Sequence, residues 1–363
     1  MEGFHVSNKV ITIQSHKGEY SASFMSGGMD QLNNAPVENA VYIIDQNIVQ
    51  LYKDRLGNIL SSQRVIKIEA TEENKSLDKI PGYVDELVAV NIRRDQTLIA
   101  IGGGIIQDIT CFLATTVMRG VPWIFYPTTL LAQSDSCIGS KSSINSGEVK
   151  NILGTFTPPE KVVIDVDFLQ TLEQREIFSG IGEMLKVHAI NSPESFDLIS
   201  AAYEDILKDP VIMEEFIHNS LSMKKKLIEI DEFDQGVRNV MNYGHSFGHA
   251  IESATNYGIP HGIAVTIGMD IANFVSAELK VSDVSHFERM HNVLEKNYRT
   301  YQHVDISVES LLNALSKDKK NSATQLRLIF PDQNGCIGIG LYDNNSKLKN
   351  SLDKYFKLYG GVN

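Results

Sequence analysis

The chain has 363 residues, of which 42% are hydrophobic and 21% are charged, as in ordinary globular proteins. Its formal net charge is −12. This excess of acidic residues argues against a general nucleic-acid or anionic-membrane surface, because such surfaces need clustered lysine and arginine. A chain of this length is expected to form two domains, and an anionic small molecule would need several cations gathered in one pocket.

The three cysteines, Cys111, Cys137 and Cys336, are widely separated and form no CxxC pair. An odd number excludes a complete disulfide framework and favours reduced thiols. The N-terminal stretch lacks the pattern of a signal peptide, and no apolar run is long enough to span a bilayer. We therefore expect a soluble, cytoplasmic protein.

The first half of the chain alternates short β-branched runs with polar or helical stretches. Strands are predicted at 41–44, 65–68, 98–101, 121–126 and 162–164, with a helix from 105 to 119. Strands that alternate with helices predict a parallel sheet covered by helices on both faces.

From about residue 179 the pattern becomes helical. Amphipathic helices are predicted at 196–207, 211–230, 244–255 and 263–278, with one short late strand at 326–330. These patterns predict an α/β domain over 1–178 and a helical domain over 179–363. A cleft between such domains is a common place for a small-molecule site.

A glycine-rich turn, Gly102–Gly104, joins a predicted strand to a predicted helix. Residues without Cβ atoms let a pyrophosphate approach the backbone, and amides at a helix N-terminus favour its negative charge. The spacing is not GxGxxG, so a tight turn that binds nothing explains the glycines equally well. Asp45 and Asn47 follow an earlier strand, where they fit either a ribose contact or ordinary loop polarity.

Histidine and glutamate residues form a candidate metal site. His245 and His249 are four residues apart, which places them on one face of a helix, and His261 begins the next predicted helix. Glu183 is an acid within a stretch of apolar and small residues. Such a set suits zinc or a similar divalent ion, although a hydrogen-bonded structural histidine is the alternative at each position.

Several basic residues lie beside glycine, asparagine or aspartate rather than in runs of charge. A solvated surface cation is the alternative for each of them. They are Arg119, Lys141, Lys150, Lys186, Lys224, Arg238 and the lysines of 317–320.

Together, these motifs resemble the sugar phosphate cyclases over nearly the whole chain, and among them the 3-dehydroquinate synthase family. Many short motifs in one order are more specific than any one of them. The matching stretches are Asp45-x-Asn47, Glu72-x-x-Lys75, Gly102-Gly-Gly-x-x-x-Asp108, Met118-Arg-Gly120, Pro127-Thr-Thr-Leu-Leu-Ala-Gln133, Asp135-Ser136, Lys141, Lys150-Asn151, Glu183-x-x-Lys186, Asn242-x-x-Gly-His-x-x-Gly-His249 and His261-Gly262.

The resemblance implies a nucleotide-binding α/β N-terminal domain and an all-α C-terminal metal-binding domain, usually in a homodimer. It implies that Glu183, His245 and His261 hold zinc or cobalt, and that His249 contacts substrate instead. The implied NAD contacts are Asp45, Asn47, Glu72, Lys75, Gly103, Gly104, Asp108, Thr128, Thr129, Lys141, Lys150, Phe168 and Thr171.

The same resemblance implies three groups of substrate contacts. The phosphate group would be held by Arg119, Lys141, Asn151, His249 and a lysine of 317–320, with Lys320 as the chosen candidate. The carboxylate would meet Lys224 and Arg238. The ring hydroxyls would meet Asp135, Lys186 and Asn242, and Lys150 would lie between cofactor and substrate.

The implied reaction converts 3-deoxy-arabino-heptulosonate 7-phosphate to 3-dehydroquinate and phosphate, in the shikimate pathway to aromatic amino acids. It combines transient oxidation by NAD, elimination of phosphate, reduction and an intramolecular aldol closure, without net redox change. The alternatives are a cyclase acting like 2-deoxy-scyllo-inosose synthase, a sedoheptulose 7-phosphate cyclase or an aminodehydroquinate synthase. A metal-dependent polyol or alcohol dehydrogenase and a non-catalytic protein that keeps the fold are further alternatives.

Five positions differ from the family pattern and concern the identity of the substrate. Ser140 replaces a glycine before Lys141, and Thr71 replaces a glycine before Glu72. Val187-His188 stands where Tyr-Gly is usual. Ile263 follows His261-Gly262 in place of an acid, and an isoleucine cannot orient a ligand histidine by hydrogen bonding.

Overall fold

The computed structural model describes residues 9–147, 149–304, 306–317 and 324–360, which form two compact units. The first unit comprises 1–173 and 217–233, and the second comprises 174–216 and 234–363. The structural division thus falls five residues before the expected boundary after residue 178, and it also returns 217–233 to the first unit.

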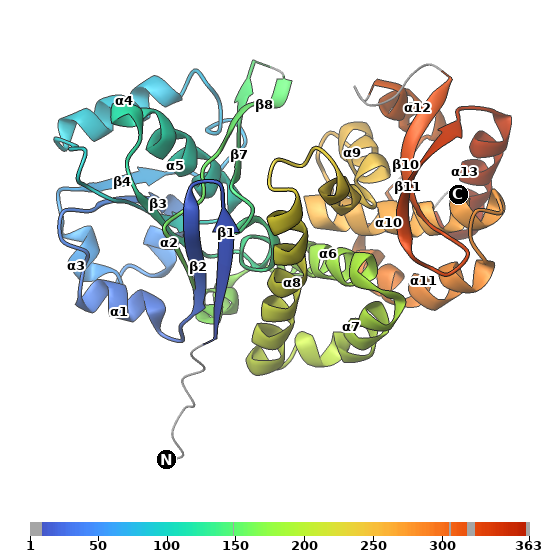
Figure 1. Ribbon diagram of the computed structural model, residues 1–363, viewed down its shortest axis with the longest axis horizontal. Coiled ribbons are helices and arrows are strands. Elements are labelled where there is room, and N and C mark those ends of the chain that lie inside the picture. The colour runs from blue at the N-terminus through green and yellow to red at the C-terminus, as the bar shows by residue number, and fades with distance from the viewer. Residues whose placement is uncertain (1–8, 148, 305, 318–323, 361–363) are drawn as a thin grey trace, which may run out of the picture. The chain divides into compact units, whose positions relative to one another are not determined.

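A seven-stranded sheet in the order β1-β2-β9-β6-β5-β3-β4 forms the centre of the first unit (Figure 1). β1 pairs with β2 in antiparallel fashion, and the remaining neighbours are parallel. The strands are β1 (Val10–Ser15), β2 (Gly18–Phe24), β3 (Val41–Asp45), β4 (Val65–Ile68), β5 (Leu98–Gly102), β6 (Trp123–Pro127) and β9 (Lys161–Ile164).

Helices cover both faces of this sheet, as the alternation of strands and helices predicts. α4 (Ile80–Ala89) and α5 (Gly104–Thr116) lie on one face (Figure 1). The opposite face packs against α1 (Gly28–Asn34), α2 (Gln46–Leu51) and α3 (Gly57–Leu60). β3 and β5 are buried at every position, which explains why their sequences are continuous apolar runs.

A two-stranded antiparallel hairpin of β7 (Lys141–Ser146) and β8 (Val149–Phe156) lies outside the main sheet. Its register shifts between Ile144 and Ser146. The hairpin carries Lys141, Lys150 and Asn151, three of the candidate site residues.

The second unit is largely helical, and α10 (His261–Glu278) lies at its centre. Every residue of α10 from Gly262 to Ser276 is buried, as expected for a helix that is apolar on all sides. It packs against α6 (Gln174–Asn191), α9 (His245–Ala254), α11 (Val284–Tyr298) and α13 (Ser346–Tyr359).

The remaining elements of this unit include α7 (Pro193–Ile206), α12 (Val308–Lys317) and a hairpin of β10 (Gln325–Pro331) and β11 (Ile337–Asp343). β10 is the late strand that the sequence predicts, so a small sheet accompanies the helices. α8 (Pro210–Ile230) begins in the second unit and continues into the first. Among the residues that the structure describes, no helix has the length and apolar character to cross a membrane.

Candidate active site

Two glycines bring α6 and α10 into backbone contact. A Cβ at Gly182 would lie 2.2 Å from the carbonyl oxygen of Gly262, and a Cβ at Gly262 would lie 1.8 Å from the carbonyl oxygen of Ser179. No other residue fits at such distances, so this helix contact requires both glycines. Glu183 and His261 are their immediate neighbours in the chain, so the contact sets the positions of both candidate ligands.

Glu183 lies at the centre of the candidate metal site. Its Oε1 is 3.8 Å from Nε2 of His245 and 3.6 Å from Nε2 of His261, while its Oε2 contacts Nζ of Lys186. The Glu183 side chain is only 2% exposed, and its Oε1 has no hydrogen-bond partner among the described residues. Leaving a buried carboxylate oxygen without a donor is costly unless a cation compensates it. One carboxylate and two imidazoles therefore fit a divalent cation of the zinc type.

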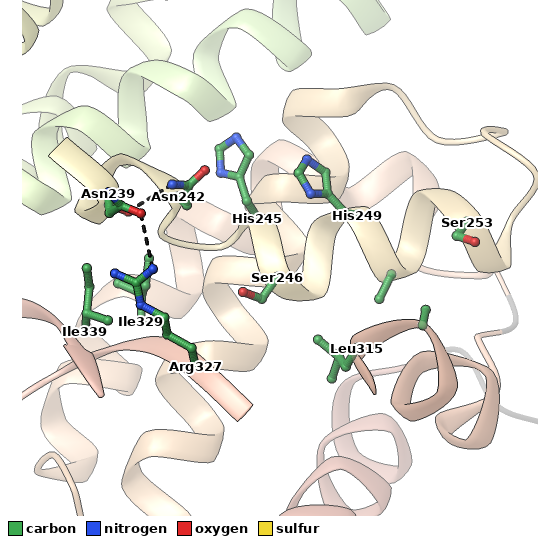
Figure 2. Close-up of a pocket in the computed structure, with 12 residues that line it drawn as sticks. Asn239, Asn242, His245, Ser246, His249, Ser253, Leu315, Arg327, Ile329 and Ile339 are labelled. Atoms are coloured by element: carbon green, nitrogen blue, oxygen red, sulfur yellow. Dashed lines mark hydrogen bonds between the residues drawn. The ribbon is translucent and has the colours of Figure 1, made fainter. Parts of the chain in front are cut away.

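His249 belongs to the same cluster. One ring nitrogen each of His245, His249 and His261 lie within 4.8 Å of one another. His245 and His249 project from the same face of α9 (Figure 2), as the spacing of four residues predicts. The geometry therefore leaves His249 within reach of either a cation or a ligand bound beside it.

Hydrogen bonds with Tyr243 and Glu252 orient two of these histidines. Nδ1 of His245 lies 3.2 Å from the carbonyl oxygen of Tyr243. Because a carbonyl oxygen can only accept a hydrogen bond, Nδ1 carries the proton. The lone pair of Nε2 is therefore free to bind a cation on the side of Glu183. Burial, followed by the positive charge of Lys186, holds the pKa of His245 well below its ordinary value. The neutral ring that results is the form that binds a metal.

His261 is oriented by Glu252 of α9, whose Oε1 lies 3.2 Å from Nδ1 of His261. Ile263 itself cannot orient His261 by hydrogen bonding, and Glu252 supplies an acid for this purpose from another helix. Ile263 is fully buried in α10 and contributes to packing. A signal for Glu252 was present in the sequence, since His245, His249 and Glu252 occupy positions i, i+4 and i+7 of one helix face.

A cavity of about 470 Å³ opens beside His245 and His249 (Figure 2). Asn242, the predicted ring-hydroxyl contact, lines it from the segment Val237–Asn242. The remaining lining residues are Asn239, Ser246, Ala250, Ser253, Ala314, Leu315, Arg327, Ile329 and Ile339.

Arg327 of β10 is a cation in this cavity that sequence reasoning missed. Its Nη1 donates to Oδ1 of Asn239 at 3.3 Å, and the carbonyl oxygen of Asn239 accepts from Nδ2 of Asn242 at 3.0 Å. The contact links Arg327 to the segment that also carries Arg238, which is 4% exposed. The only sequence signal was an arginine inside an otherwise apolar strand.

In the first unit, the glycine-rich turn begins α5. Packing explains two of its glycines: a Cβ at Gly102 would meet the Ile106 side chain at 2.5 Å, and one at Gly103 would meet Thr129 at 2.9 Å. Around Gly104 the nearest atom to a Cβ would be 4.0 Å away. The protein itself therefore does not require glycine at 104, and the open space at the start of α5 suits the pyrophosphate of a dinucleotide.

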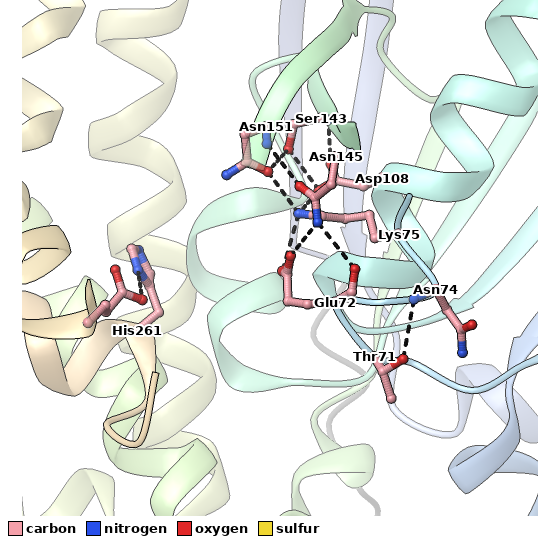
Figure 3. A network of polar contacts seen from close by, with 10 residues as sticks. Thr71, Glu72, Asn74, Lys75, Asp108, Ser143, Asn145, Asn151 and His261 are labelled. Atoms are coloured by element: carbon pink, nitrogen blue, oxygen red, sulfur yellow. Dashed lines mark hydrogen bonds and ion pairs between the residues drawn. The ribbon is translucent and has the colours of Figure 1, made fainter. Parts of the chain in front are cut away.

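A polar network connects several of the predicted cofactor and substrate residues of the first unit (Figure 3). Nζ of Lys75 donates to Oδ2 of Asp108 and to Oδ1 of Asn151, each at 3.0 Å, and lies 3.4 Å from Oε1 of Glu72. Ser143 donates to Asp108 and Asn151 through its hydroxyl. Burial alone would lower the pKa of Lys75, but the charges of Asp108 and Glu72 raise it, so the amine remains a charged donor.

The other predicted cofactor residues lie at the ends of strands or beside them. Oδ1 of Asp45 accepts from the backbone N–H of Asn47 and caps α2. Oγ1 of Thr129 accepts from the N–H of Ala132. The backbone N–H of Thr128 donates to the carbonyl oxygen of Gly102.

Phe168 and Thr171 meet Tyr52 of the hydrophobic core. The Phe168 ring is 2% exposed and packs edge-on against Tyr52, whose hydroxyl lies 2.8 Å from Oγ1 of Thr171. Only the main chain of Phe168 is therefore available to a cofactor.

Two of the remaining predicted substrate contacts form an ion pair. Nζ of Lys224, predicted to meet the carboxylate, lies 3.0 Å from Oδ2 of Asp135, predicted to meet a ring hydroxyl. Arg119 lines a different cavity of the first unit, of about 270 Å³, whose lining includes neither Lys141 nor Asn151. Lys320 and its neighbours 318–323 lie outside the described residues.

The structure shows how three of the unusual residues are accommodated. Ser140 has a φ of 64° and donates from Oγ to Oε1 of Glu232 at 2.6 Å, so the hydroxyl gains a partner in a conformation that glycine would adopt more easily. His188 is buried, with Nδ1 3.1 Å from the carbonyl oxygen of Ser195. Thr71 accepts from the N–H of Asn74 through Oγ1.

Comparison with solved structures defines the fold as that of the sugar phosphate cyclases. 2-Deoxy-scyllo-inosose synthase, solved with carbaglucose-6-phosphate, NAD⁺ and Co²⁺, superimposes with a TM-score of 0.81 at 21% identity, covering 95% of this chain and 100% of that chain. 2-Epi-5-epi-valiolone synthase from Streptomyces hygroscopicus, solved with NAD⁺ and Zn²⁺, gives a TM-score of 0.82 at 23% identity, covering 93% and 97%. Glycerol dehydrogenase from Schizosaccharomyces pombe gives 0.60 at 17% identity, covering 99% and 95%.

Sequence comparison defines the family. The profile of the 3-dehydroquinate synthase N-terminal domain matches residues 65–179, and that of the C-terminal domain matches 180–321. The chain is 32% identical to 3-dehydroquinate synthase of Streptococcus pyogenes over 329 residues, 89% of this chain and 92% of that protein. It is 34% identical to the Dehalococcoides mccartyi enzyme over 302 residues, 81% and 84% of the two chains. The chain belongs to the 3-dehydroquinate synthase family.

Proposed function

We propose that this protein converts 3-deoxy-arabino-heptulosonate 7-phosphate to 3-dehydroquinate and inorganic phosphate. The observation that carries the proposal is the buried Glu183 carboxylate, whose Oε1 faces His245 and His261 and has no donor among the residues that the structure describes. Family membership supports the same reaction, since the relatives at 32–34% identity are 3-dehydroquinate synthases.

The proposed cofactors are NAD and a divalent cation, zinc or cobalt. Glu183, His245 and His261 would hold the cation, and the open turn at Gly104 with Asp45, Glu72 and the other predicted contacts would hold NAD. When bound, NAD removes a hydride from a secondary alcohol and later returns it, while the cation polarises the alcohol oxygen.

The chain's own residues would orient the substrate and balance its charges. We assign the carboxylate to Arg238 and Lys224, and the ring hydroxyls to Lys186, Asn242 and Asp135. We assign the phosphate to Lys141, Asn151, His249 and a lysine of 317–320, but not to Arg119, which lines a different cavity. Lys150 would lie between cofactor and substrate. Cations held in place before the substrate arrives stabilise the phosphate as it leaves, without reorganisation at that moment.

The test is to incubate the pure protein with the seven-carbon substrate, NAD⁺ and Zn²⁺, and to assay phosphate and cyclic product together. We expect equal amounts of both, with no net accumulation of NADH. NADH formed in step with substrate would instead establish a dehydrogenase. Turnover of glucose 6-phosphate or sedoheptulose 7-phosphate alone would establish a different cyclase.

The matched relatives favour a carboxylate-bearing substrate over these alternatives, because identity to the carbocycle-forming synthases of other substrates is only 21–23%. We further propose that the protein acts as a cytoplasmic homodimer in the shikimate pathway. Analytical ultracentrifugation of the purified protein tests the dimer.

A further inference from the structure

Asn145 of β7 uses all four of its hydrogen-bonding groups within the first unit. Its backbone N–H donates to the carbonyl oxygen of Lys75 at 2.9 Å, and its carbonyl oxygen accepts from the N–H of Leu77 at 2.8 Å. Its side-chain Oδ1 accepts from the N–H of Asn151 at 2.9 Å. Its Nδ2 donates to Oε2 of Glu72 at 2.8 Å and to the Glu72 carbonyl oxygen at 3.2 Å.

These five hydrogen bonds join two chain segments that the proposed function assigns to different ligands. Glu72 and Lys75 belong to the proposed cofactor contacts, and Asn151 belongs to the proposed phosphate contacts. Asn145 is 6% exposed and lies between them (Figure 3). It therefore reaches both groups of residues from a buried position that no ligand needs to touch.

The contact to Asn151 fixes an unusual backbone conformation. Asn151 has a φ of 53°, in the left-handed region that non-glycine residues rarely occupy. Because the Asn145 oxygen accepts from the N–H of Asn151, it stabilises this conformation. Asn151 in turn accepts at Oδ1 from Lys75 and Ser143, two donors, so its side-chain NH₂ is the group that remains to face a ligand.

We propose that Asn145 is a positioning residue that holds the Glu72 carboxylate for the cofactor and the Asn151 amide for the phosphate group at the same time. The inference rests on the proposed function for the identity of the two ligands. The buried Asn145 amide would keep Glu72 and Asn151 in a fixed geometry relative to each other.

The chemistry of the site requires an amide of this length. Alanine would leave the N–H of Asn151 and Oε2 of Glu72 without the partners that Asn145 provides, although Lys75 would still contact Oε1 of Glu72. Aspartate would keep an acceptor for Asn151 but would place a second negative charge against Glu72, in place of the donor. Glutamine has the right groups but is one methylene too long for a buried position that is already packed.

The experiment compares wild-type protein with Asn145→Ala and Asn145→Asp. NAD⁺ binding is measured by isothermal titration calorimetry, and the Michaelis constant is measured for the seven-carbon phosphate substrate. We expect Asn145→Ala to weaken NAD⁺ binding and to raise the Michaelis constant, each by roughly tenfold, as for a buried polar group left unsatisfied. Bound zinc should remain unchanged, because the ligands belong to the second unit.

Asn33→Ala is the matched control. Oδ1 of Asn33 also accepts from backbone N–H groups of another segment, those of Asn58 and Ile59, and none of these residues is among the proposed cofactor or substrate contacts. Both alanine variants should lower the melting temperature, but only Asn145→Ala should change the binding constants.

Asn145→Asp provides a second measurement, the pH dependence of NAD⁺ affinity, which should not change if Asn145 only stabilises the fold. Its NAD⁺ affinity, relative to wild type at the same pH, should recover as the pH is lowered. A protonated aspartate again offers one donor and one acceptor, and like charges in contact raise the pKa of such a pair. Flat, pH-independent affinity in this variant would overturn the proposal.

The calorimetric arm separates the two proposals. If wild-type protein forms no cyclic product but Asn145→Ala still weakens NAD⁺ binding, the positioning role stands and the proposed reaction falls. If wild type is active and Asn145→Ala behaves like Asn33→Ala, the positioning role falls alone. Wild-type protein that binds no NAD⁺ overturns both.

Discussion

The two oxygens of the Glu183 carboxylate differ in their partners. Its Oε2 is compensated by Lys186, whereas its Oε1 has two imidazole nitrogens nearby and no donor among the described residues. His245 cannot donate from Nε2, because its proton is held at Nδ1 by the carbonyl of Tyr243. The acceptors therefore converge on one point, as a cation would require.

Replacing Glu183 with glutamine should remove the bound metal and reduce kcat/KM by about 10³-fold or more, since polarisation by a metal contributes several kcal/mol. The measurements are metal content by mass spectrometry and the rate of phosphate release. His249→Gln is the matched control: we assign His249 to the substrate, so this variant should retain its metal and lose activity. Loss of metal from His249→Gln alone would reverse the two assignments.

Glu252 should strengthen metal binding without touching the metal. Glu252→Ala removes the acceptor of His261 Nδ1, and we expect about 10–100-fold weaker zinc affinity, as for other orienting partners of metal ligands. Competition with a zinc chelator measures the affinity. Glu278→Ala, which breaks a partly exposed ion pair of α10 with Lys354, is the control and should leave zinc affinity unchanged.

His188 predicts a pH dependence of stability. Burial lowers its pKa from 6.5 to about 4, and its Nε2 has no partner among the described residues. Below pH 6.5 His188 is protonated in the unfolded chain, whereas in the folded chain it stays neutral until about pH 4. The free energy of unfolding therefore falls as the pH drops through this window. The loss amounts to about 3 kcal/mol when complete.

Urea unfolding at several pH values tests this expectation. His188→Gln cannot titrate, so its free energy of unfolding should change less between pH 7 and pH 5 than that of wild type, whatever its stability at neutral pH. Equal slopes for the two proteins would show that His188 does not contribute to the pH dependence.

At the scale of single residues, motifs in the sequence indicated candidate ligands such as Glu183 and His261, and the structure brings these two within 3.6 Å of each other. Supporting contacts were harder to predict. Glu252 shares a helix face with His245 and His249, but its pairing with His261 of another helix follows from no local pattern. Asn145 and Arg327 were missed because they contact residues from other segments of the chain.

At the scale of elements, close helix packing builds the candidate metal site of the second unit. Gly244 and Gly268 join α9 to α10 in the same way that Gly182 and Gly262 join α6 to α10: a Cβ at Gly268 would lie 2.1 Å from the carbonyl oxygen of Gly244. Each candidate metal ligand is the chain neighbour of one of these glycines. Backbone contacts between three helices thus determine where the ligands meet.

Gly262→Ala should therefore separate α6 from α10, lowering stability by about 1–3 kcal/mol or more and weakening zinc binding. Chemical denaturation and zinc titration measure the two effects. Gly82→Ala in α4 is the control, because nothing lies within 4 Å of its Cβ position and φ is not positive. That variant should be neutral or stabilised by about 0.5–1 kcal/mol.

Most strands that the sequence predicted are more buried than those that it missed. β3, β5 and β9 lie inside the sheet and are largely apolar runs, and the edge strand β4 is the exception. β1 alternates exposed and buried positions at the other edge, and β8 is exposed or half-buried throughout, so neither shows a long apolar signal. β2, which was also missed, pairs with the distant strand β9, and a local pattern does not reveal such a partner.

At the scale of the whole molecule, the net charge of −12 contrasts with the cations assigned to the substrate. Long-range repulsion of an anionic substrate must be offset by lysines and arginines close to it. The alternation of strands and helices correctly predicted one α/β unit and one largely helical unit. It could not predict that residues 217–233 belong with the first unit, since a continuous helix gives no sign of a boundary.

Ligands that bind only the folded protein should stabilise it. NAD⁺ at 100 times its dissociation constant should add about 2.7 kcal/mol to the free energy of unfolding, and zinc should act likewise. Thermal unfolding with each ligand alone and with both tests this expectation, and EDTA should cancel the effect of zinc only. An unchanged melting temperature with NAD⁺ would argue against a nucleotide site at Gly104.

The backbone contacts among α6, α9 and α10 also limit which ions the site can accept. Helices that touch through their main chains cannot move apart to enlarge the space between their side chains, because protein interiors are densely packed. Calcium needs six to eight oxygen ligands, whereas the proposed ligand set here offers one carboxylate and two imidazoles in fixed positions. The donor set should therefore favour zinc or cobalt over calcium, and the glycines that fix its geometry never touch the ion.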